Sequence, residues 1–265
     1  ISNLGIRSLI MSLFQGFPFL ITALLLNFFG KASKWQKDPR FWITFFLGFL
    51  IIGLSRGIHW GLLIRWGLAP EEWFLLRSSI NWAMKLTMVL VLFGAFYLTF
   101  DTSLGHFYGF TFRKFNMNPY LTLLGIALFF IIIGSFFGDL QSYYPRYKVD
   151  HGLSFAVHHE VPTWVSVLIY ESTYATSFIT VEFIFRGFLI YAFVKYFGPY
   201  AILPMVATYC FLHFGKPATE TLSSIFGGYV LGIIALKNKN IWGGVMVHVG
   251  VAWSMELFGY LQTRF

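Results

Sequence analysis

Three observations predict an all-α polytopic membrane protein, a helical bundle of about eight transmembrane helices. Of the 265 residues, 57% are hydrophobic and only 11% are charged, whereas soluble domains carry about 25% charged residues. Phenylalanine alone contributes 33 residues. Residues 8–30 and 115–138 contain no Lys, Arg, Asp, Glu or His. Either run exceeds the roughly 20 residues that cross a hydrocarbon core as a helix.

Eight hydrophobic segments follow one another along the chain. Prolines near the segment starts and glycines near their ends suggest the boundaries. We expect helices over residues 6–29, 41–63, 80–100, 118–138, 163–195, 199–214, 217–236 and 241–262. No change of composition marks off a soluble part, so residues 1–265 are expected to form a single membrane domain.

The net charge of +8 is spread over short loops rather than gathered in one patch. Such loops orient a membrane protein, because cytoplasmic loops carry an excess of Lys and Arg. We therefore expect the lipid bilayer, and no nucleic acid, as a partner. The odd-numbered loops are the more basic ones, which places both termini outside the cytoplasm.

The longest connection is expected between residues 141 and 163, and it contains the run His158, His159 and Glu160. These three residues suggest a metal site. However, adjacent side chains point in different directions on most backbones, so we favour a solvated loop. Glu71 and Glu72 are likewise expected in a solvated connection between two helices.

The fifth segment, which includes "ITVEFIFRGFL", places ionisable residues at membrane depth. Such residues are costly in lipid and usually face a protein interior or a wet cavity. Glu182 and Arg186 are spaced i, i+4 and can pair on one helix face. Glu171 lies about three turns earlier on nearly the same face. A structural ion pair that fixes helix packing explains Glu182 and Arg186 equally well.

Two later segments add His213 and His248 at membrane depth, and Glu220 follows His213 closely in "HFGKPATE". A lone buried histidine is more often a packing residue than a functional one. Two histidines together with Glu220 and the Glu–Arg pair favour convergence on one hydrated cavity. Such a cavity would hold a base and hydrogen-bond donors, the minimum for chemistry that uses water.

Three motifs in this half, "VEFIFRG", "YCFLH" and "VMVHVGVA", resemble the ordered motifs of a known family. This is the CAAX-protease and bacteriocin-processing (CPBP) membrane family, which includes the Ras-converting CAAX endopeptidases and the bacterial Abi proteins. The resemblance covers about residues 160–260, the motif-bearing core. It implies a membrane-embedded endopeptidase that hydrolyses a peptide near the bilayer surface without a cofactor. It also implies a multi-pass protein of the bacterial inner (plasma) membrane.

The chain departs from the family pattern at two polar positions. Val181 stands where the family has the first Glu of a Glu-Glu pair, and Ala252 stands where it has Asn or Asp. Tyr209 replaces a phenylalanine, which is a mild change. The resemblance, together with Glu220 as a substitute carboxylate, gives five candidate catalytic residues: Glu182, Arg186, His213, Glu220 and His248.

Other interpretations remain open. His213 and His248 with Glu182 or Glu220 would make a two-histidine, one-carboxylate zinc site. Cys210 is spaced for a thiol nucleophile near His213, although a buried cysteine is usually a core residue. The two missing polar residues also suit a catalytically degenerate protein that acts as a binding or assembly component of a membrane complex. The expected partner is therefore a membrane-associated peptide or protein substrate, or a complex partner.

Overall fold

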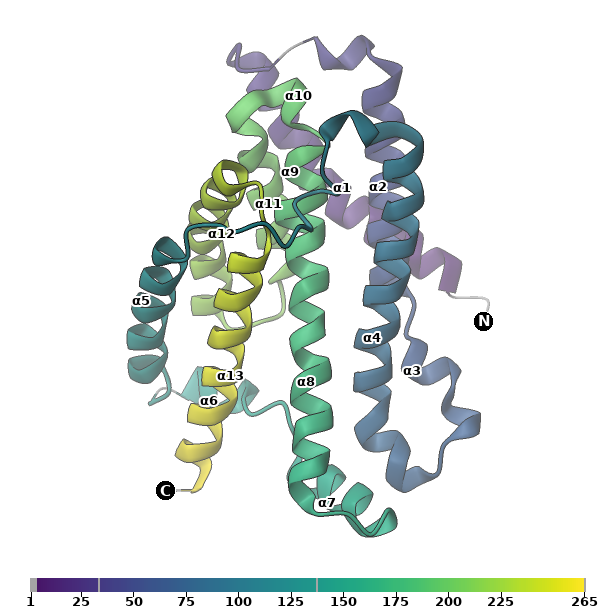
Figure 1. Cartoon of the computed structure of the whole chain (residues 1–265), viewed down its shortest axis with the longest axis vertical. Helices are drawn as coiled ribbons and strands as arrows, with labels where there is room; N and C mark the ends of the chain where they lie inside the picture. Colours follow the sequence, from purple (N-terminus) through teal and green to yellow (C-terminus); the bar gives the residue numbers. More distant parts are fainter. Residues whose placement is uncertain (1–3, 33, 137, 265) are drawn as a thin grey trace. The chain divides into compact units, whose positions relative to one another are not determined.

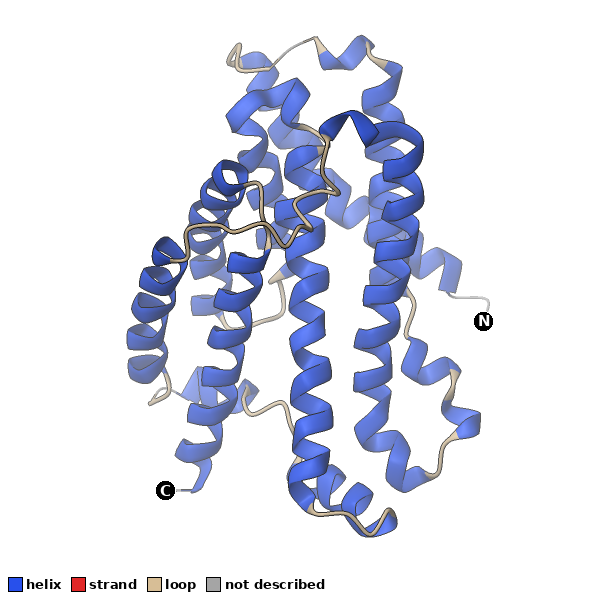
Figure 2. Cartoon of the chain, in the orientation of Figure 1, coloured by secondary structure: helices blue, strands red, loops and turns tan. Residues whose placement is uncertain are grey.

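The computed structural model describes residues 4–32, 34–136 and 138–264, and within these ranges it contains helices and no strand (Figures 1 and 2). Six of the helical stretches described are long and apolar enough to cross a membrane: Leu4–Phe28, Pro39–Gly57, Pro70–Leu104, Thr163–Tyr191, Ala218–Asn238 and Trp242–Gln262. The prediction of an all-α polytopic membrane protein is therefore confirmed.

The helices follow the order of the eight predicted segments, with additions between them. Their bounds are α1 Leu4–Phe28, α2 Pro39–Gly57, α3 Trp60–Leu63, α4 Pro70–Phe96, α5 Asn118–Gly134, α6 Gly138–Tyr143, α7 Val149–His158, α8 Thr163–Glu182, α9 Leu189–Tyr191, α10 Val194–Phe197, α11 Ile202–Leu212, α12 Ala218–Asn238 and α13 Trp242–Arg264. Two π-helical turns, Tyr97–Asp101 and Phe183–Phe188, continue α4 and α8. The helices α5 and α11 have 17 and 11 residues, and both are shorter than the segments 118–138 and 199–214 predicted for them.

Two expectations about connections are wrong. The solvated connection expected around Glu71 and Glu72 is the first turn of α4, which begins at Pro70 rather than near residue 80. The long loop expected over residues 141–163 contains the end of α6 and all of α7. Polar residues hid both helices, because hydropathy marks the part of a helix that faces lipid and not its polar ends.

The described residues group into two compact units. The first unit draws on residues 1–58, 88–117 and 181–244, and the second on residues 59–87, 118–180 and 245–265. The candidate residues Glu182, Arg186, His213 and Glu220 belong to the first unit, and His248 belongs to the second. The single membrane domain stays a prediction.

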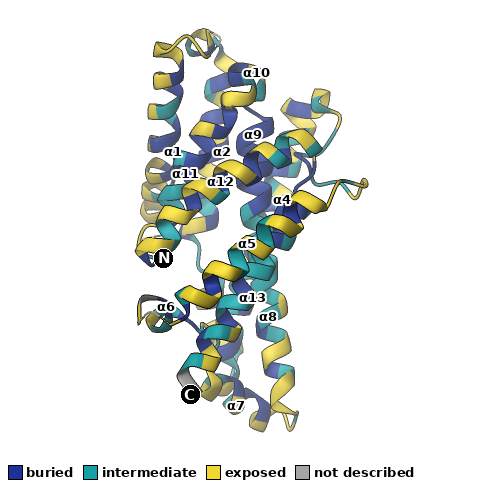
Figure 3. Cartoon of the chain, turned by 90° about the vertical axis from the view of Figure 1, so that its left-hand side faces the viewer, coloured by how far each residue is buried: buried dark blue, intermediate teal, exposed yellow. Residues whose placement is uncertain are grey.

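Aromatic side chains form the core of the first unit, in which α1 packs against α2 and α11, and α11 packs against α12. Phe19 of α1 is fully buried, with its ring centroid 5.3 Å from that of Phe49 and 4.6 Å from that of Phe193. Buried residues gather on α2, α9 and α11 (Figure 3). Large buried rings contribute much apolar area each, so this cluster holds the helices that carry the candidate site.

An irregular segment, residues 105–117, also belongs to the first unit. The Tyr108 hydroxyl donates to Asp101 Oδ2 at 2.7 Å, and the Ile241 amide donates to the Gly109 carbonyl oxygen at 3.1 Å. His106 Nδ1 accepts the Gly109 N–H at 3.2 Å, and burial lowers the pKa of this imidazole. The segment is thus fixed by buried polar contacts.

The second unit contains a smaller core and a buried carboxylate. Phe155 of α7 and Tyr170 of α8 belong to that core. Glu256 of α13 accepts the backbone N–H groups of Arg146 and Tyr147, with its Oε1 2.8 Å from the Arg146 nitrogen and its Oε2 3.0 Å from the Tyr147 nitrogen. These donors satisfy an acid that would otherwise be costly to bury.

Candidate active site

Glu182 and Arg186 form a completely buried ion pair in the first unit. Glu182 ends α8, and Arg186 lies in the π-helical turn that follows. Arg186 Nη1 lies 3.0 Å from Glu182 Oε1, and neither side chain is exposed. Removing a charge from water costs several kcal/mol, and an opposite charge at contact distance offsets that cost. The pairing expected from the i, i+4 spacing is therefore present.

The turn that carries Arg186 departs from the regular helix expected over residues 163–195. The six residues Phe183–Phe188 are π-helical, and all six are buried. A π turn accommodates an extra residue and redirects the side chains around it, and such turns occur frequently at functional sites. The π turn therefore interrupts the regular helix between Glu182 and Arg186 without breaking their i, i+4 contact.

Tyr209 of α11 connects the ion pair to His213. The guanidinium carbon of Arg186 lies 4.2 Å from the centroid of the Tyr209 ring, a cation–π contact. The Tyr209 ring centroid is in turn 4.5 Å from that of the His213 imidazole, with the two planes at 70°. The π turn and α11 therefore place Arg186, Tyr209 and His213 in one continuous row.

The turn between α11 and α12 brings His213 and Glu220 together. His213 caps the C-terminus of α11, and Glu220 lies in the first turn of α12. The Thr221 hydroxyl donates to the His213 carbonyl oxygen at 2.9 Å, which ties the two helix ends together. His213 Nε2 lies 3.9 Å from Glu220 Oε1. Lys216 Nζ donates to the same carboxylate oxygen.

The contact at Nδ1 shows which nitrogen of His213 carries a proton. Nδ1 lies 2.9 Å from the Tyr209 carbonyl oxygen, and a carbonyl oxygen can only accept, so Nδ1 carries the hydrogen. In the neutral imidazole, Nε2 is then an acceptor, and it faces Glu220. A separation of 3.9 Å is too long for a direct hydrogen bond but allows one water to contact both atoms.

Two glycines permit the close packing around the ion pair. A Cβ atom on Gly244, in the first turn of α13, would overlap the carboxylate of Glu182, whose Cδ would be 2.7 Å away. A Cβ atom on Gly187, which follows Arg186, would lie 2.7 Å from the Tyr108 carbonyl oxygen. Both distances are shorter than the distances that real Cβ atoms keep from their neighbours. Each position therefore requires glycine, which has no Cβ.

Much of this region matches a known family. The model of the type II CAAX prenyl endopeptidase Rce1-like family matches residues 152–254. Residues 152–254 are therefore similar to this family. The matched range includes all three motifs and confirms the resemblance predicted from them. Searches of the curated proteins and of the solved structures found no match. The chain thus combines membrane-spanning helices with a region similar to a protease family.

Within the Rce1-like region, the two departures from the motif pattern are packed residues. Val181 packs against the aromatic core of the first unit. Ala252 is buried in the second unit, at 4% exposed. His248 also lies in the second unit, where its ring stacks on Phe178 with centroids 5.7 Å apart and planes at 18°. Its convergence with the candidate residues of the first unit stays a prediction.

The alternative zinc set also stays a prediction, because it takes ligands from both units. The same holds for the predicted polar stripe, since Glu171 belongs to the second unit and Glu182 to the first. A different trio of potential metal ligands is close together in the described part of the chain, namely Glu72, His158 and His159.

Three contacts of the candidate residues were not predicted from the sequence, namely those made by Tyr209, Lys216 and Gly244. The i, i+4 spacings of Tyr209 with His213 and of Lys216 with Glu220 are the signals that could have indicated their contacts. Nothing in the sequence indicates that Gly244 faces Glu182, because the two residues are far apart in the chain and meet only through packing.

Proposed function

We propose that this protein is a membrane-embedded endopeptidase of the CPBP type, which hydrolyses a membrane-associated peptide or protein near the bilayer surface. The single observation that carries the proposal is the His213–Glu220 pair, set 3.9 Å apart inside the Rce1-like region. We place the activity in a bacterial inner membrane, as the resemblance to the Abi proteins implies.

In this proposal, His213 and Glu220 hold and activate the attacking water. The unprotonated Nε2 of His213 accepts a proton from that water as the water oxygen bonds to the substrate carbonyl carbon, while Glu220 Oε1 accepts a hydrogen bond from the hydrogen that remains. Glu220 stabilises the imidazolium that forms, as a carboxylate beside a histidine does in other hydrolases. The imidazolium then gives its proton to the amine that leaves when the C–N bond breaks. The two side chains are 7% and 13% exposed, unlike the fully enclosed Glu182, and the proposal requires that water reaches them at the turn between α11 and α12.

Arg186 is proposed to act as the counter-charge of Glu182 rather than to contact the substrate, because both side chains are fully buried. The pair holds the end of α8 and the π-helical turn in one arrangement, since either charge alone would be costly to bury. Through the Tyr209 ring, which contacts both Arg186 and His213, the pair positions His213.

His248 is the remaining candidate, and the resemblance assigns it to the oxyanion. The family's second donor position is Ala252 in this chain. Losing one oxyanion donor lowers a rate by about 10²–10³-fold, so hydrolysis slower than that of a complete motif set is expected. Val181 leaves the first carboxylate position apolar, and Glu220 supplies the substitute carboxylate.

A test requires the full chain in lipid nanodiscs, mixed with a panel of lipidated and membrane-anchored peptides, with products identified by mass spectrometry. His213→Asn and Glu220→Gln should each lower cleavage by about 10²–10⁴-fold, the usual contribution of a general base. The same exchanges in the second unit, His151→Asn and Glu71→Gln, serve as matched controls and should leave the rate unchanged. Equal rates in all variants would refute the assigned roles.

A second candidate function is that of a binding or assembly component of a membrane complex. The packing of Val181 against the core and the burial of Ala252 favour it, since neither position offers a polar group to a substrate. This function predicts no product from any peptide in the panel. It also predicts that the wild-type chain and His213→Asn retain the same membrane partners in a crosslinking experiment.

A further inference from the structure

A cluster of two histidines and a glutamate lies in the second unit, outside the candidate active site. Glu72 comes from the first turn of α4, and His158 and His159 come from the end of α7. Each of the three offers one potential ligand atom, and these atoms all lie within 4.8 Å of one another. His158 is the last residue of α7 rather than part of a loop, and both histidines are exposed, as the expectation of solvated side chains requires.

The position of Glu72 is fixed by the start of α4. Its Oε2 accepts the Ala69 N–H at 2.8 Å. Glu72 thus caps the N-terminus of α4 from within the first turn of the helix. This contact leaves Oε1 directed at His159, whose Nε2 is 3.0 Å away. The carboxylate is thus held before any ion arrives, which reduces the entropy lost on binding.

The end of α7 turns both imidazoles toward Glu72. Adjacent residues on a helix differ in direction by about 100° rather than pointing to opposite sides, so two neighbours can flank one partner. The His159 ring packs on Phe155 with centroids 4.4 Å apart. The ring of His158 stands perpendicular to that of His159, with centroids 4.9 Å apart.

The residue after the pair adds a further restraint. Glu160 has a φ of +53°, a left-handed conformation that costs a residue other than glycine about 1–2 kcal/mol. The Val161 amide donates to the Ala156 carbonyl oxygen at 2.9 Å and closes the last turn of α7. This closed turn determines where the chain leaves the helix and hence the direction of the histidines.

We propose that Glu72, His158 and His159 bind a divalent transition-metal ion of the zinc class. Two imidazole nitrogens and one carboxylate oxygen are a ligand set that zinc takes with water in the remaining position. Bonds of about 2.0–2.2 Å place tetrahedral ligand atoms roughly 3.4 Å apart. The three atoms reach that arrangement by side-chain shifts of about 1 Å, and the exposed His158 is free to make the largest one.

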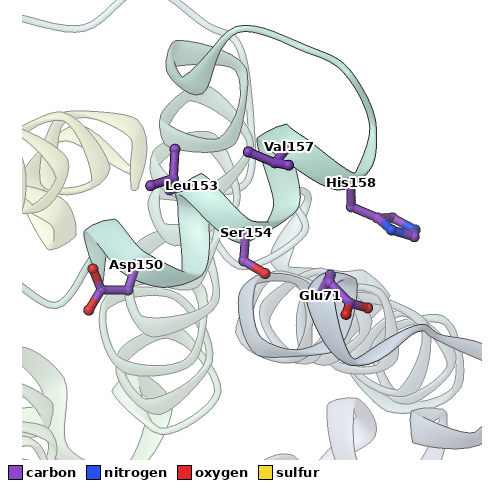
Figure 4. A pocket seen from close by; sticks show the side chains of 6 residues that line it. All are labelled: Glu71, Asp150, Leu153, Ser154, Val157 and His158. Atoms are coloured by element: carbon purple, nitrogen blue, oxygen red, sulfur yellow. The ribbon is translucent and has the colours of Figure 1, made fainter.

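The surroundings favour a cation. A shallow groove beside the cluster is lined by Glu71 of α4 and by Asp150, His158 and three other residues of α7 (Figure 4). In Figure 4 the Glu71 carboxylate, from α4, and the His158 imidazole, from α7, both lie toward the right of the view. Acidic groups that line a concave surface raise the local concentration of cations. The bound ion would join the end of α7 to the start of α4 within the second unit.

The alternative to a metal site is an ordinary exposed ion pair between His159 and Glu72. Such pairs contribute about 0–1 kcal/mol, and the contact of His159 with Glu72 alone would satisfy it. It gives no role to His158, whose replacement would then leave zinc binding unchanged. Binding at His158 is therefore the property that separates the two interpretations.

The test uses the full chain in detergent, without a polyhistidine tag and stripped of metal by a chelator. Zinc chloride is titrated by calorimetry into the wild type, His158→Ala, Glu72→Gln and the matched control His151→Ala, which changes a histidine elsewhere on α7. Loss of a supporting group around a metal weakens affinity about 10–100-fold. Loss of a ligand should weaken it at least as much, and the control should bind like the wild type.

X-ray absorption at the zinc edge provides a second readout that does not depend on the variants. The proposal predicts two imidazoles in the coordination shell of the bound ion in the wild type and one in His158→Ala. Absence of zinc binding by the wild type, or equal affinity in His158→Ala, would overturn it. A coordination shell without imidazole would do so as well.

Discussion

Replacing Gly244 with alanine would drive a methyl group into the carboxylate of Glu182. The added Cβ would overlap that carboxylate, with Glu182 Cδ only 2.7 Å away. Because Glu182 and Arg186 are both fully enclosed, the carboxylate has no solvent to move into. Either the ion pair is displaced or the first turn of α13 shifts away from it.

The magnitude follows from three opposing contributions. Alanine favours a helix over glycine by about 1 kcal/mol. Overpacking a close-packed site costs about 1–3 kcal/mol, and breaking a buried ion pair completely costs about 3–5 kcal/mol. If the displaced carboxylate loses only part of its contact with Arg186, Gly244→Ala should still lower the free energy of unfolding by about 2 kcal/mol.

The assay is denaturant unfolding of the purified chain in detergent, with Gly227→Ala as the matched control. A Cβ atom on Gly227 of α12 meets no atom within 4 Å, so this variant should be as stable as the wild type or slightly more stable. In a Glu182→Ala background the obstacle is gone, and Gly244→Ala should then be neutral or stabilising. An equal loss in both backgrounds would refute the reasoning, as would Gly244→Ala with wild-type stability.

Three further predictions concern the first unit. Arg186→Met should lower the free energy of unfolding by about 3–5 kcal/mol, because Glu182 is left buried without its cation. Denaturant unfolding measures this loss, and a loss below about 1 kcal/mol would contradict the burial argument. Gly187→Ala should lower the free energy of unfolding by about 1–3 kcal/mol, because the backbone oxygen of Tyr108, at 2.7 Å from the new Cβ, cannot rotate away. A melting temperature equal to that of the wild type would count against this prediction. Burial holds the pKa of His106 below its unfolded value, so the unfolded chain binds more protons and stability falls as the pH drops through about 6.5. Melting temperature should therefore fall less on acidification in His106→Gln than in the wild type, and identical profiles would contradict this cause.

Hydropathy and spacing predicted most of the helices, and physical reasons explain the exceptions. The uncharged runs of α1 and α5 leave no alternative to helices in lipid. The first ten residues of α4 were missed because its polar first turn lies beyond the apolar stretch. The π turn at Phe183–Phe188 was missed because an α-helix and a π turn contain the same apolar residues. Packing of the surrounding rings, which no local pattern records, distinguishes the two.

The candidate site was predictable where its contacts are local. The i, i+4 spacing indicated the pair of Glu182 and Arg186, and the short turn in "HFGKPATE" indicated that Glu220 returns toward His213. The role of Tyr209 between them depends on how α11 packs against the π turn, and sequence spacing contains no information on that. For the same reason, the approach of His158 and His159 to Glu72 required the structure.

The central claim is that His213 and Glu220 act as one unit on a single water. Groups that act together show strongly non-additive losses of activity. The most direct measurement is therefore kcat for cleavage of a membrane-anchored peptide by His213→Asn, Glu220→Gln and the double variant. The account predicts that the double variant is no slower than the slower single variant. Losses that multiply, or a Glu220→Gln variant with wild-type kcat, would contradict it.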